Sequence, residues 1–295
     1  MNPSKGKSTT GLPNKDLEVS DAGHKQLKPT KQPSQAQQHR VQRWSSERPQ
    51  PTSAQDWLAE ETPVALCYNG VCHLVMMVTP DYLEDFALGF SLSEGILESP
   101  GQLYGIDIEV HEQGIEVNLE IAARQALALK AQKRNLTGRT GCGLCGTDSL
   151  EHANRQPDPV APTEPVTDEA IQQALSQLNQ HQPMQQLTGA FHGAAWCNRD
   201  GEIQLLREDV GRHNALDKLL GALAVDGFDP QQGFVLISSR ASYEMVQKTA
   251  SAGISQLVAV SAPTALAVRL AEQTGVRLTG FARDGSHVHY CPPCL

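Results

Sequence analysis

The stretch Phe234-Val-Leu-Ile-Ser-Ser-Arg-Ala-Ser-Tyr-Glu-Met245 decides how the second half of this chain folds. Its first four residues form a continuous apolar run, which is typical of a strand buried on both faces. The polar residues that follow indicate a turn, and a helix is expected next. Further elements continue this alternation: a helix at Tyr243–Ala252, a strand at Leu257–Val260, a helix at Thr264–Thr274 and a strand at Arg277–Phe281. This β-α-β-α-β order predicts a parallel sheet covered by helices.

The residues before this series predict the other elements of the same layer. Thr167 is expected to cap a helix that runs to about His181. Two strands, at Phe191–Cys197 and Ile203–Leu206, bracket a turn, and a helix is expected at about Arg212–Leu223.

The first half of the chain predicts a different arrangement. Asn69-Gly70 lies between two apolar segments, Val64–Tyr68 and Cys72–Val78, and this pattern is typical of a hairpin with a type I′ turn. Thr79-Pro-Asp81 predicts the start of a helix with Thr79 as its N-cap. Later elements are two alternating strands at Ile106–Val110 and Gly114–Ile121 and a helix at Ala122–Arg134.

Composition divides the chain into four parts. Residues 1–55 are rich in Gln, Ser, Pro and Lys and predict a disordered tail. Residues 56–150 predict a small α+β domain that ends in a glycine-rich loop. Residues 151–166 contain four prolines and predict a linker, and residues 167–291 predict the larger α/β domain.

Charge and apolar content exclude several classes of protein. The first 50 residues contain nine Lys and Arg and four Asp and Glu, a net charge of +5, whereas the rest of the chain carries −14. The acidic body disfavours nucleic-acid binding. No apolar run approaches the roughly 20 residues of a membrane helix, and the N-terminus lacks the apolar core of a signal peptide. We therefore expect a cytoplasmic protein without a membrane segment.

Cysteine usage points to thiol or metal chemistry. Seven cysteines in a long chain without a signal peptide argue against a secreted disulfide framework. Gly138-Arg-Thr-Gly-Cys-Gly-Leu-Cys-Gly146 places Cys142 and Cys145 at C-x-x-C spacing among four glycines, which suit a loop that must meet a bulky partner. Arg139 and the free backbone N–H groups of the loop favour the thiolate, which is the nucleophilic form.

A second pair, Cys291-Pro-Pro-Cys294, leaves a metal-binding alternative open. Two C-x-x-C pairs could supply a tetrahedral Cys₄ zinc site. The long separation from Cys142 and Cys145, and the position at the chain end, are unlike the compact spacing of zinc modules. A packing role or a redox disulfide is a further alternative for the first pair.

Three polar segments at strand ends are candidate binding sites. Arg240 follows the buried strand and could bind a phosphate together with the N-terminus of the next helix; a plain N-cap with a surface arginine is the alternative. Arg207–Lys218 gathers polar groups at a strand-to-helix junction, where a helix-capping network is an equally good explanation. Gly280–Ser286 ends the last parallel strand, where ligands often bind, although a plain β-turn also accounts for its Asp-Gly. A lone histidine such as His192, among small apolar residues, is more often a core residue.

Three of these segments together resemble the FdhD family of formate dehydrogenase accessory sulfur carriers. They are Gly138–Gly146, Glu208-Asp-Val-Gly-Arg-His213 and Ser238-Ser-Arg-Ala-Ser-Tyr-Glu-Met-Val-Gln-Lys248. Val64–Val78 and Phe86-Ala-Leu-Gly-Phe-Ser-Leu-Ser-Glu-Gly95 match as well. The resemblance spans roughly residues 61–289, outside the tail and the C-terminal Cys-Pro-Pro-Cys.

The resemblance implies a function in sulfur transfer. A family member accepts persulfide sulfur from a cysteine desulfurase and passes it to the molybdenum cofactor, a bis-molybdopterin guanine dinucleotide, before its insertion into formate dehydrogenase. By resemblance, Cys142 carries the persulfide and Cys145 assists or accepts it. The cofactor would be cargo, with no permanent metal, and its binding stretch falls on Phe281, Ala282, Arg283, Asp284, Gly285 and Ser286, with Arg240 as a further contact.

The resemblance also implies a fold and an assembly. Family members have a cytidine-deaminase-like α/β/α core, here expected in the C-terminal half, and a homodimer is expected. A zinc deaminase needs H-x-E and P-C-x-x-C, whereas this chain has His192-Gly-Ala194 and Tyr290 before Cys291. Deamination is therefore disfavoured. Two functional alternatives stay open: a zinc-stabilised chaperone that binds the cofactor without sulfur transfer, and a thioredoxin-like oxidoreductase.

Overall fold

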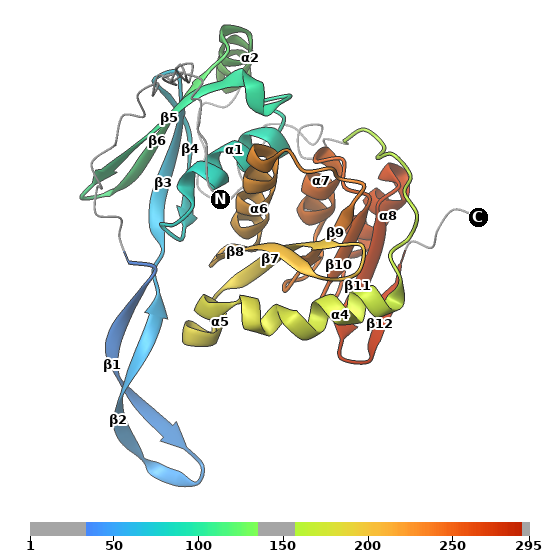
Figure 1. Ribbon diagram of the computed structural model, residues 1–295. Coiled ribbons are helices and arrows are strands. Elements are labelled where there is room, and N and C mark those ends of the chain that lie inside the picture. Colours follow the sequence, from blue (N-terminus) through green and yellow to red (C-terminus); the bar gives the residue numbers. More distant parts are fainter. Residues whose placement is uncertain (1–33, 135–156, 291–295) are drawn as a thin grey trace, which may run out of the picture. The chain divides into compact units, whose positions relative to one another are not determined.

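The structure is a computed structural model that describes residues 34–134 and 157–290 (Figure 1). Its largest sheet has the strand order β12-β11-β10-β9-β7-β8. The six strands are β7 (His192–Asn198), β8 (Ile203–Asp209), β9 (Gly233–Ile237), β10 (Gln256–Ala259), β11 (Arg277–Arg283) and β12 (Ser286–His289). Strands β9, β10 and β11 are parallel, as predicted, whereas β7, β8 and β12 pair antiparallel. The sheet is therefore mixed.

Helices cover both faces of this sheet (Figure 1). Helices α6 (Arg212–Asp226), α7 (Tyr243–Ser251) and α8 (Ala265–Thr274) bury their apolar residues against one face. Helix α4 (Asp168–Leu178) packs on the other and is followed by the short η2 (Asn179–His181) and α5 (Pro183–Thr188). Thr167 caps α4, as predicted, by accepting a hydrogen bond from the Ala170 backbone N–H. The α/β fold class is confirmed, while the specific likeness to a cytidine deaminase stays a prediction.

A second sheet of four strands forms from the first half of the chain. Its order is β4-β3-β6-β5, and one face is covered by α1 (Leu83–Ser93) and α2 (Ala123–Arg134). The strands are β3 (Thr62–Tyr68), β4 (Val71–Val78), β5 (Leu103–His111) and β6 (Gly114–Ile121), with the short η1 (Pro100–Gln102) before β5. Asn69 and Gly70 have φ angles of 48° and 76°. These positive angles confirm the predicted type I′ hairpin.

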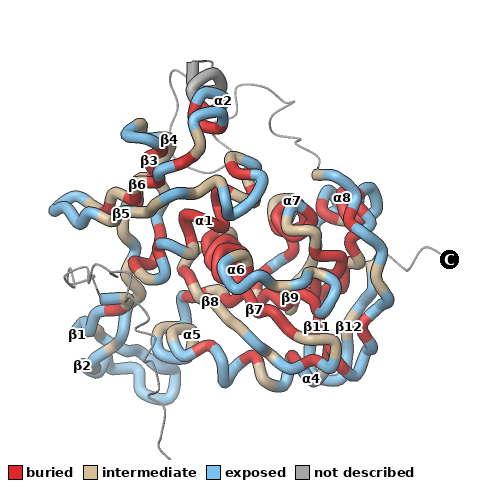
Figure 2. Tube along the Cα trace, turned by 45° about the horizontal axis from the view of Figure 1, so that its top comes forward, coloured by how far each residue is buried: buried red, intermediate tan, exposed pale blue. Residues whose placement is uncertain are grey.

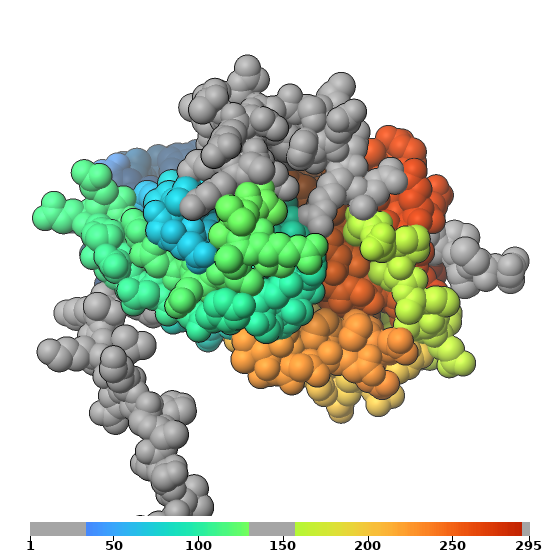
Figure 3. All heavy atoms as spheres, turned by 90° about the horizontal axis from the view of Figure 1, so that it is seen from above, coloured from blue at the N-terminus to red at the C-terminus, as the bar shows by residue number. Residues whose placement is uncertain are grey.

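Helices α1 and α6 cross at a pair of glycines and thereby join the two sheets. A Cβ on Gly89 would lie 1.8 Å from the Asp217 carbonyl oxygen, and one on Gly221 would lie 1.9 Å from that of Asp85. Real Cβ atoms do not approach other atoms so closely, so only glycine permits this crossing. In Figure 3, residues around α1 and β5, in teal, adjoin residues of α6, in orange.

The predicted disordered tail is wrong for residues 36–55. Strands β1 (Ala36–Ser45) and β2 (Arg48–Ala59) pair as an antiparallel hairpin. Most of their side chains are exposed (Figure 2), so the hairpin lacks the buried apolar face that a sequence reading looks for. Backbone pairing and polar cross-strand contacts, such as the 3.1 Å Arg43–Asp56 ion pair, hold it instead.

The predicted start of α1 is also wrong, because the helix begins at Leu83. Tyr82, with φ of 50°, occupies the N-cap position. The backbone of Thr79 is used elsewhere: its N–H donates to Asp209 and its carbonyl accepts from Lys218. Contacts with residues about 130 positions away thus displace the local capping signal.

The described part of the predicted linker packs against the larger sheet. The Val160 N–H donates to the Thr274 carbonyl at 2.8 Å, and the Val166 N–H donates to Gln256 Oε1 at 2.8 Å. Since part of residues 151–166 lies outside the described ranges, the division into two domains stays a prediction. None of the described helices has the length and apolar character that a membrane crossing needs.

Candidate functional site

The four cysteines of the two C-x-x-C pairs lie outside the described residues. Cys142 and Cys145 fall within 135–156, and Cys291 and Cys294 fall within 291–295. Their roles therefore stay predictions. The other predicted site residues, Arg240 and Phe281–Ser286, are described.

The carboxyl ends of β9, β10 and β11 meet at one edge of the large sheet. Ala241 and Pro263 form an isolated parallel bridge, and the Thr264 N–H donates to the Ala241 carbonyl at 3.0 Å. The Phe281 N–H donates to the Ser261 carbonyl at 3.1 Å. Arg240 and Phe281 are both exposed at this edge, as the strand order predicts.

Four basic side chains gather where β8 and β9 end and β7 begins. We call His192, Arg212, His213 and Arg240 the basic cluster. Burial lowers the pKa of His192, and the nearby charge of Arg212 lowers it further, with smaller contributions from His213 and Arg240. Arg212, His213 and Arg240 therefore all lie close enough to His192 to act on its charge, and an anion would be attracted to the positive charge that gathers here.

Arg212 adds a hydrogen-bond donor to this cluster. Its Nε atom is buried and has no hydrogen-bond partner. His213 is already paired, since its Nε2 lies 2.5 Å from Glu244 Oε2. Burial alone would raise the pKa of Glu244, but the hydrogen bond and charge of His213 bring it below its ordinary value. Glu244 is thus ionised beside His213, which leaves Arg212 and Arg240 as the cations best suited to bind an anion.

The Phe281–Ser286 segment borders a cavity of about 280 Å³. Ala282, Arg283 and Asp284 line one side of it, and residues of α4 and η2 line the other. Phe281 has φ of 50°, and the Arg283 guanidinium lies 5.7 Å from the centre of its ring. Arg240 does not line the cavity. Of the predicted binding residues, Ala282, Arg283 and Asp284 therefore line the cavity and Arg240 belongs to the basic cluster, whereas Phe281, Gly285 and Ser286 belong to neither.

Sequence reasoning missed the residues that α4 and η2 contribute to the cavity. Gln172, Ser176 and Asn179 are among them, and the Nε2 atom of Gln182 is buried without a hydrogen-bond partner. A glutamine-rich amphipathic helix carries no signal that separates a cavity lining from a solvated face.

The Arg207–Lys218 segment also contributes buried polar residues, among them Asp209, Asn214 and Lys218. Lys218 Nζ lies 2.7 Å from Asp209 Oδ2, and both side chains are fully buried. Asp209 Oδ1 accepts hydrogen bonds from the Gly211 N–H at 2.8 Å and from Asn214 Nδ2 at 3.0 Å. Together with Thr79, these residues form what we call the Asp209 network. It supports the helix-capping explanation for this part of the segment.

The conspicuous stretch that ends at Lys248 also contains a structural residue. Lys248 Nζ lies 2.7 Å from Glu94 Oε1 and 3.0 Å from Asp217 Oδ1. Burial alone would lower the pKa of Lys248, but the two carboxylates raise it, so the amine stays charged. This contact ties α7 to α1 and α6 rather than facing a ligand.

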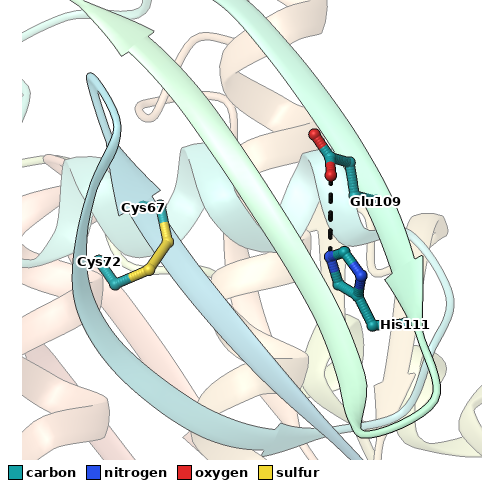
Figure 4. The surroundings of a disulfide bond; sticks show 4 residues. All are labelled: Cys67, Cys72, Glu109 and His111. Carbon is teal, nitrogen blue, oxygen red and sulfur yellow. Dashed lines mark ion pairs between the residues drawn. A yellow bond between two sulfur atoms is a disulfide. The ribbon is translucent and has the colours of Figure 1, made fainter.

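Sequence reasoning also missed a disulfide between Cys67 and Cys72 (Figure 4). The expectation that the cysteines serve only thiol or metal chemistry is wrong for this pair. The signal was present, because a two-residue turn at Asn69-Gly70 places Cys67 directly opposite Cys72. Figure 4 also shows the Glu109–His111 pair of β5, whose atoms lie 3.8 Å apart. Cys197, by contrast, is a buried free thiol whose pKa is raised by burial, which makes it a poor nucleophile.

Comparison with known proteins gives consistent results. Residues 59–294 match the model of the FdhD/NarQ family. The chain is 58% identical over 238 residues to the sulfur carrier protein FdhD of Cupriavidus necator, covering 81% of this chain and 83% of that protein. It is 52% identical over 238 residues to the sulfur carrier protein FdhD of Bordetella petrii, covering 81% and 86%.

A solved structure shows the same fold. It is the crystal structure of a protein from Desulfotalea psychrophila described as a formate dehydrogenase accessory protein, with a TM-score of 0.68 and 22% identity. The likeness covers 88% of this chain and 98% of that one.

Proposed function

This chain belongs to the FdhD/NarQ family, and from that premise we propose that it is a sulfur carrier that serves formate dehydrogenase. The identity of 58% to a sulfur carrier protein over most of both chains is the observation that carries the proposal. The glycine-framed Cys142-Gly-Leu-Cys145 supplies the chemistry that such a carrier needs.

In the proposed first step, the Cys142 thiolate attacks the outer sulfur of a persulfide on a cysteine desulfurase. A bond forms between Cys142 Sγ and that sulfur, the desulfurase sulfur–sulfur bond breaks, and the desulfurase thiolate leaves. Cys142 then carries the persulfide, and Cys145 assists the onward transfer. The reaction is of the sulfurtransferase type, and a glycine-rich loop lets the persulfide reach two different partners.

The proposed recipient is the bis-molybdopterin guanine dinucleotide form of the molybdenum cofactor. Arg212 and Arg240 are suited to bind its phosphates, because one has a buried donor without a partner and the other is exposed at the strand ends. A cavity of about 280 Å³ is too small for a whole dinucleotide cofactor but suits one nucleoside-sized part of it. Arg283 and the unpartnered Gln182 amide, which both line the cavity, offer a cation and a donor to such a group.

The experiment that tests sulfur transfer is intact-mass analysis after incubation with a cysteine desulfurase and cysteine. We expect wild-type protein to gain the mass of a sulfur atom and Cys142→Ala to gain none. Cys291→Ser is the matched control, since it removes a thiol of the other C-x-x-C pair, and it should gain sulfur as wild type does. Wild-type protein without added sulfur, or equal labelling of Cys142→Ala, would refute the proposal.

The second candidate is a zinc-stabilised chaperone that binds the cofactor without transferring sulfur. The presence of a second C-x-x-C pair favours it. Metal analysis separates the two: stoichiometric zinc that is lost on mutation of Cys142 and Cys291, with no sulfur labelling, would support the chaperone.

We further propose that the protein acts in the cytoplasm as a homodimer that meets a cysteine desulfurase and formate dehydrogenase. The outer strand β5 exposes Tyr104 and Val110, which a second copy could cover. Analytical ultracentrifugation tests the dimer, and Tyr104→Glu should shift the protein towards the monomer.

A further inference from the structure

Two histidines and an aspartate converge at the free end of the large sheet. His287 and His289 lie two residues apart on β12, so their side chains share one face of the strand. Asp168 is the first residue of α4. The Nε2 atoms of His287 and His289 lie 2.9 and 3.0 Å from the same oxygen, Asp168 Oδ1. The three potential ligand atoms all lie within 4.8 Å of one another.

The Nδ1 atom of each imidazole ring forms a hydrogen bond with a neighbouring polar side chain. His289 Nδ1 lies 3.0 Å from Thr279 Oγ1, and His287 Nδ1 lies 3.1 Å from Gln172 Nε2. Histidines that bind metals are oriented in this way by a contact at the nitrogen that faces away from the metal. When Thr279 accepts the Nδ1–H of His289, the lone pair of Nε2 is free to bind a metal.

We propose that His287, His289 and Asp168 bind a divalent transition-metal ion, with Zn²⁺ as the best match. Two imidazoles and one carboxylate are donors that suit zinc, and a water molecule would complete a tetrahedron. The site does not depend on the proposed sulfur transfer, and it differs from the expectation that the protein holds no permanent metal.

The two separations that involve Asp168 need only a small adjustment to accept the ion. Ligand atoms around tetrahedral zinc lie about 3.3 Å apart, whereas the two nitrogen–oxygen distances here are 2.9 and 3.0 Å. The Asp168 side chain is 67% exposed and can move outwards by a few tenths of an ångström.

The side-chain amide of Gln172 must flip when the metal binds, so that its Oε1 and Nε2 atoms exchange positions. Its Oε1 accepts a hydrogen bond from the Gly285 N–H at 2.9 Å, so its Nε2 faces His287 Nδ1. With the metal on Nε2, His287 carries its proton on Nδ1 and needs an acceptor there, which the reversed amide supplies. Gly285 is exposed, so water can replace the acceptor that its N–H loses.

A structural explanation of the same contacts is that the histidines only hold β12 against α4. Zinc titration of the full-length protein by isothermal calorimetry, with accessible thiols first alkylated, separates the two explanations. We expect one equivalent of Zn²⁺ to bind, and His287→Gln and His289→Gln each to weaken binding at least tenfold. The matched control is His111→Gln, which removes an exposed histidine paired with a carboxylate on β5 and should bind as wild type does.

Cobalt substitution gives a readout that needs no variant. Co²⁺ bound here should show visible absorption typical of four-coordinate cobalt without the near-ultraviolet band of thiolate ligation. Absence of stoichiometric binding, or unchanged affinity in both histidine variants, would overturn the proposal.

The contact with Gln172 supplies a test in which the substitution should strengthen zinc binding, whereas the histidine substitutions should weaken it. Gln172→Glu offers a carboxylate oxygen both to the Nδ1–H of His287 and to the Gly285 N–H, so zinc affinity should rise about tenfold. Affinity that falls in this variant would contradict the proposed role of His287 as a ligand. Thermal melts of the metal-free variants check that each one folds.

Discussion

The Asp209 network and the basic cluster both include residues of one short segment, Arg207–Lys218, but they differ in how their charges are satisfied. In the Asp209 network, Lys218 and Asp209 are fully buried, and each has an opposite charge and further hydrogen bonds. In the basic cluster, three cationic side chains lie near His192 and lower its pKa, and Arg212 Nε has no partner. Buried ions are stable only when they are paired. The completed network therefore serves the fold, and the incomplete one is suited to a ligand.

The largest expected effect comes from breaking the Asp209 network. Lys218→Met keeps most of the side-chain volume but leaves the Asp209 carboxylate buried without its cation. We expect the free energy of unfolding to fall by about 3–5 kcal/mol, as measured by urea denaturation. Arg240 is an exposed member of the basic cluster, so Arg240→Gln should change the free energy of unfolding by less than about 0.5 kcal/mol. A Lys218→Met variant as stable as wild type would show that the network contributes little to the fold.

Substitutions in the basic cluster should have a smaller effect, which is limited to the affinity for a phosphate-containing ligand. Guanosine diphosphate carries the phosphates and base that we assign to the cargo. Loss of a charge-assisted hydrogen bond costs about 1.5–3 kcal/mol, so Arg240→Gln and Arg212→Gln should each weaken its binding about tenfold or more, as measured by calorimetry. Arg199→Gln is the control, because it removes the same charge from a half-buried arginine in the β7–β8 turn that lies outside the basic cluster.

Equal binding by Arg240→Gln and Arg199→Gln would contradict the phosphate site. A general loss in all three variants would mean that only the overall charge matters, and the contrast between the Asp209 network and the basic cluster would then concern the fold alone.

Much of the fold follows from local patterns in the sequence. The apolar run Phe234–Ile237 predicts a buried parallel strand, and the core residues around it confirm this. The start of α1 could not be predicted, because Thr79 is bound by Asp209 and Lys218 from the other half of the chain. The hairpin at residues 36–59 could not be predicted either, since its polar strands resemble a disordered segment.

The site was predictable to the extent that strand ends determine it. Arg240 follows β9, and Phe281 lies near the carboxyl end of the parallel strand β11, so both reach the same edge. The cavity beside Phe281 also needs α4, and nothing in the sequence indicates which of its glutamines face inwards. Arg207–Lys218 was a candidate because it gathers polar groups at a strand-to-helix junction, but only the structure separates the unpartnered Arg212 Nε from the paired His213.

The smallest expected effect is a pH dependence that originates in the basic cluster. Burial and the charges of Arg212, His213 and Arg240 lower the pKa of His192, while Asp209 partly opposes them. Above the ordinary histidine pKa of about 6.5, His192 is neutral in both the folded and the unfolded state. As the pH falls below that value, the unfolded chain binds the proton first, so the free energy of unfolding decreases until the folded state is protonated as well.

His192→Gln should remove this part of the pH dependence. Because His192 is only half-buried, the difference should stay below about 1 kcal/mol. Urea denaturation of both proteins at several values between pH 7.5 and 5 measures it. Arg212→Gln should raise the pKa of His192 and reduce the wild-type decrease, because the second-largest cause of the shift is then absent. A decrease of the same size in His192→Gln would assign it to other groups, and an unaltered decrease in Arg212→Gln would mean that Arg212 and His192 do not interact.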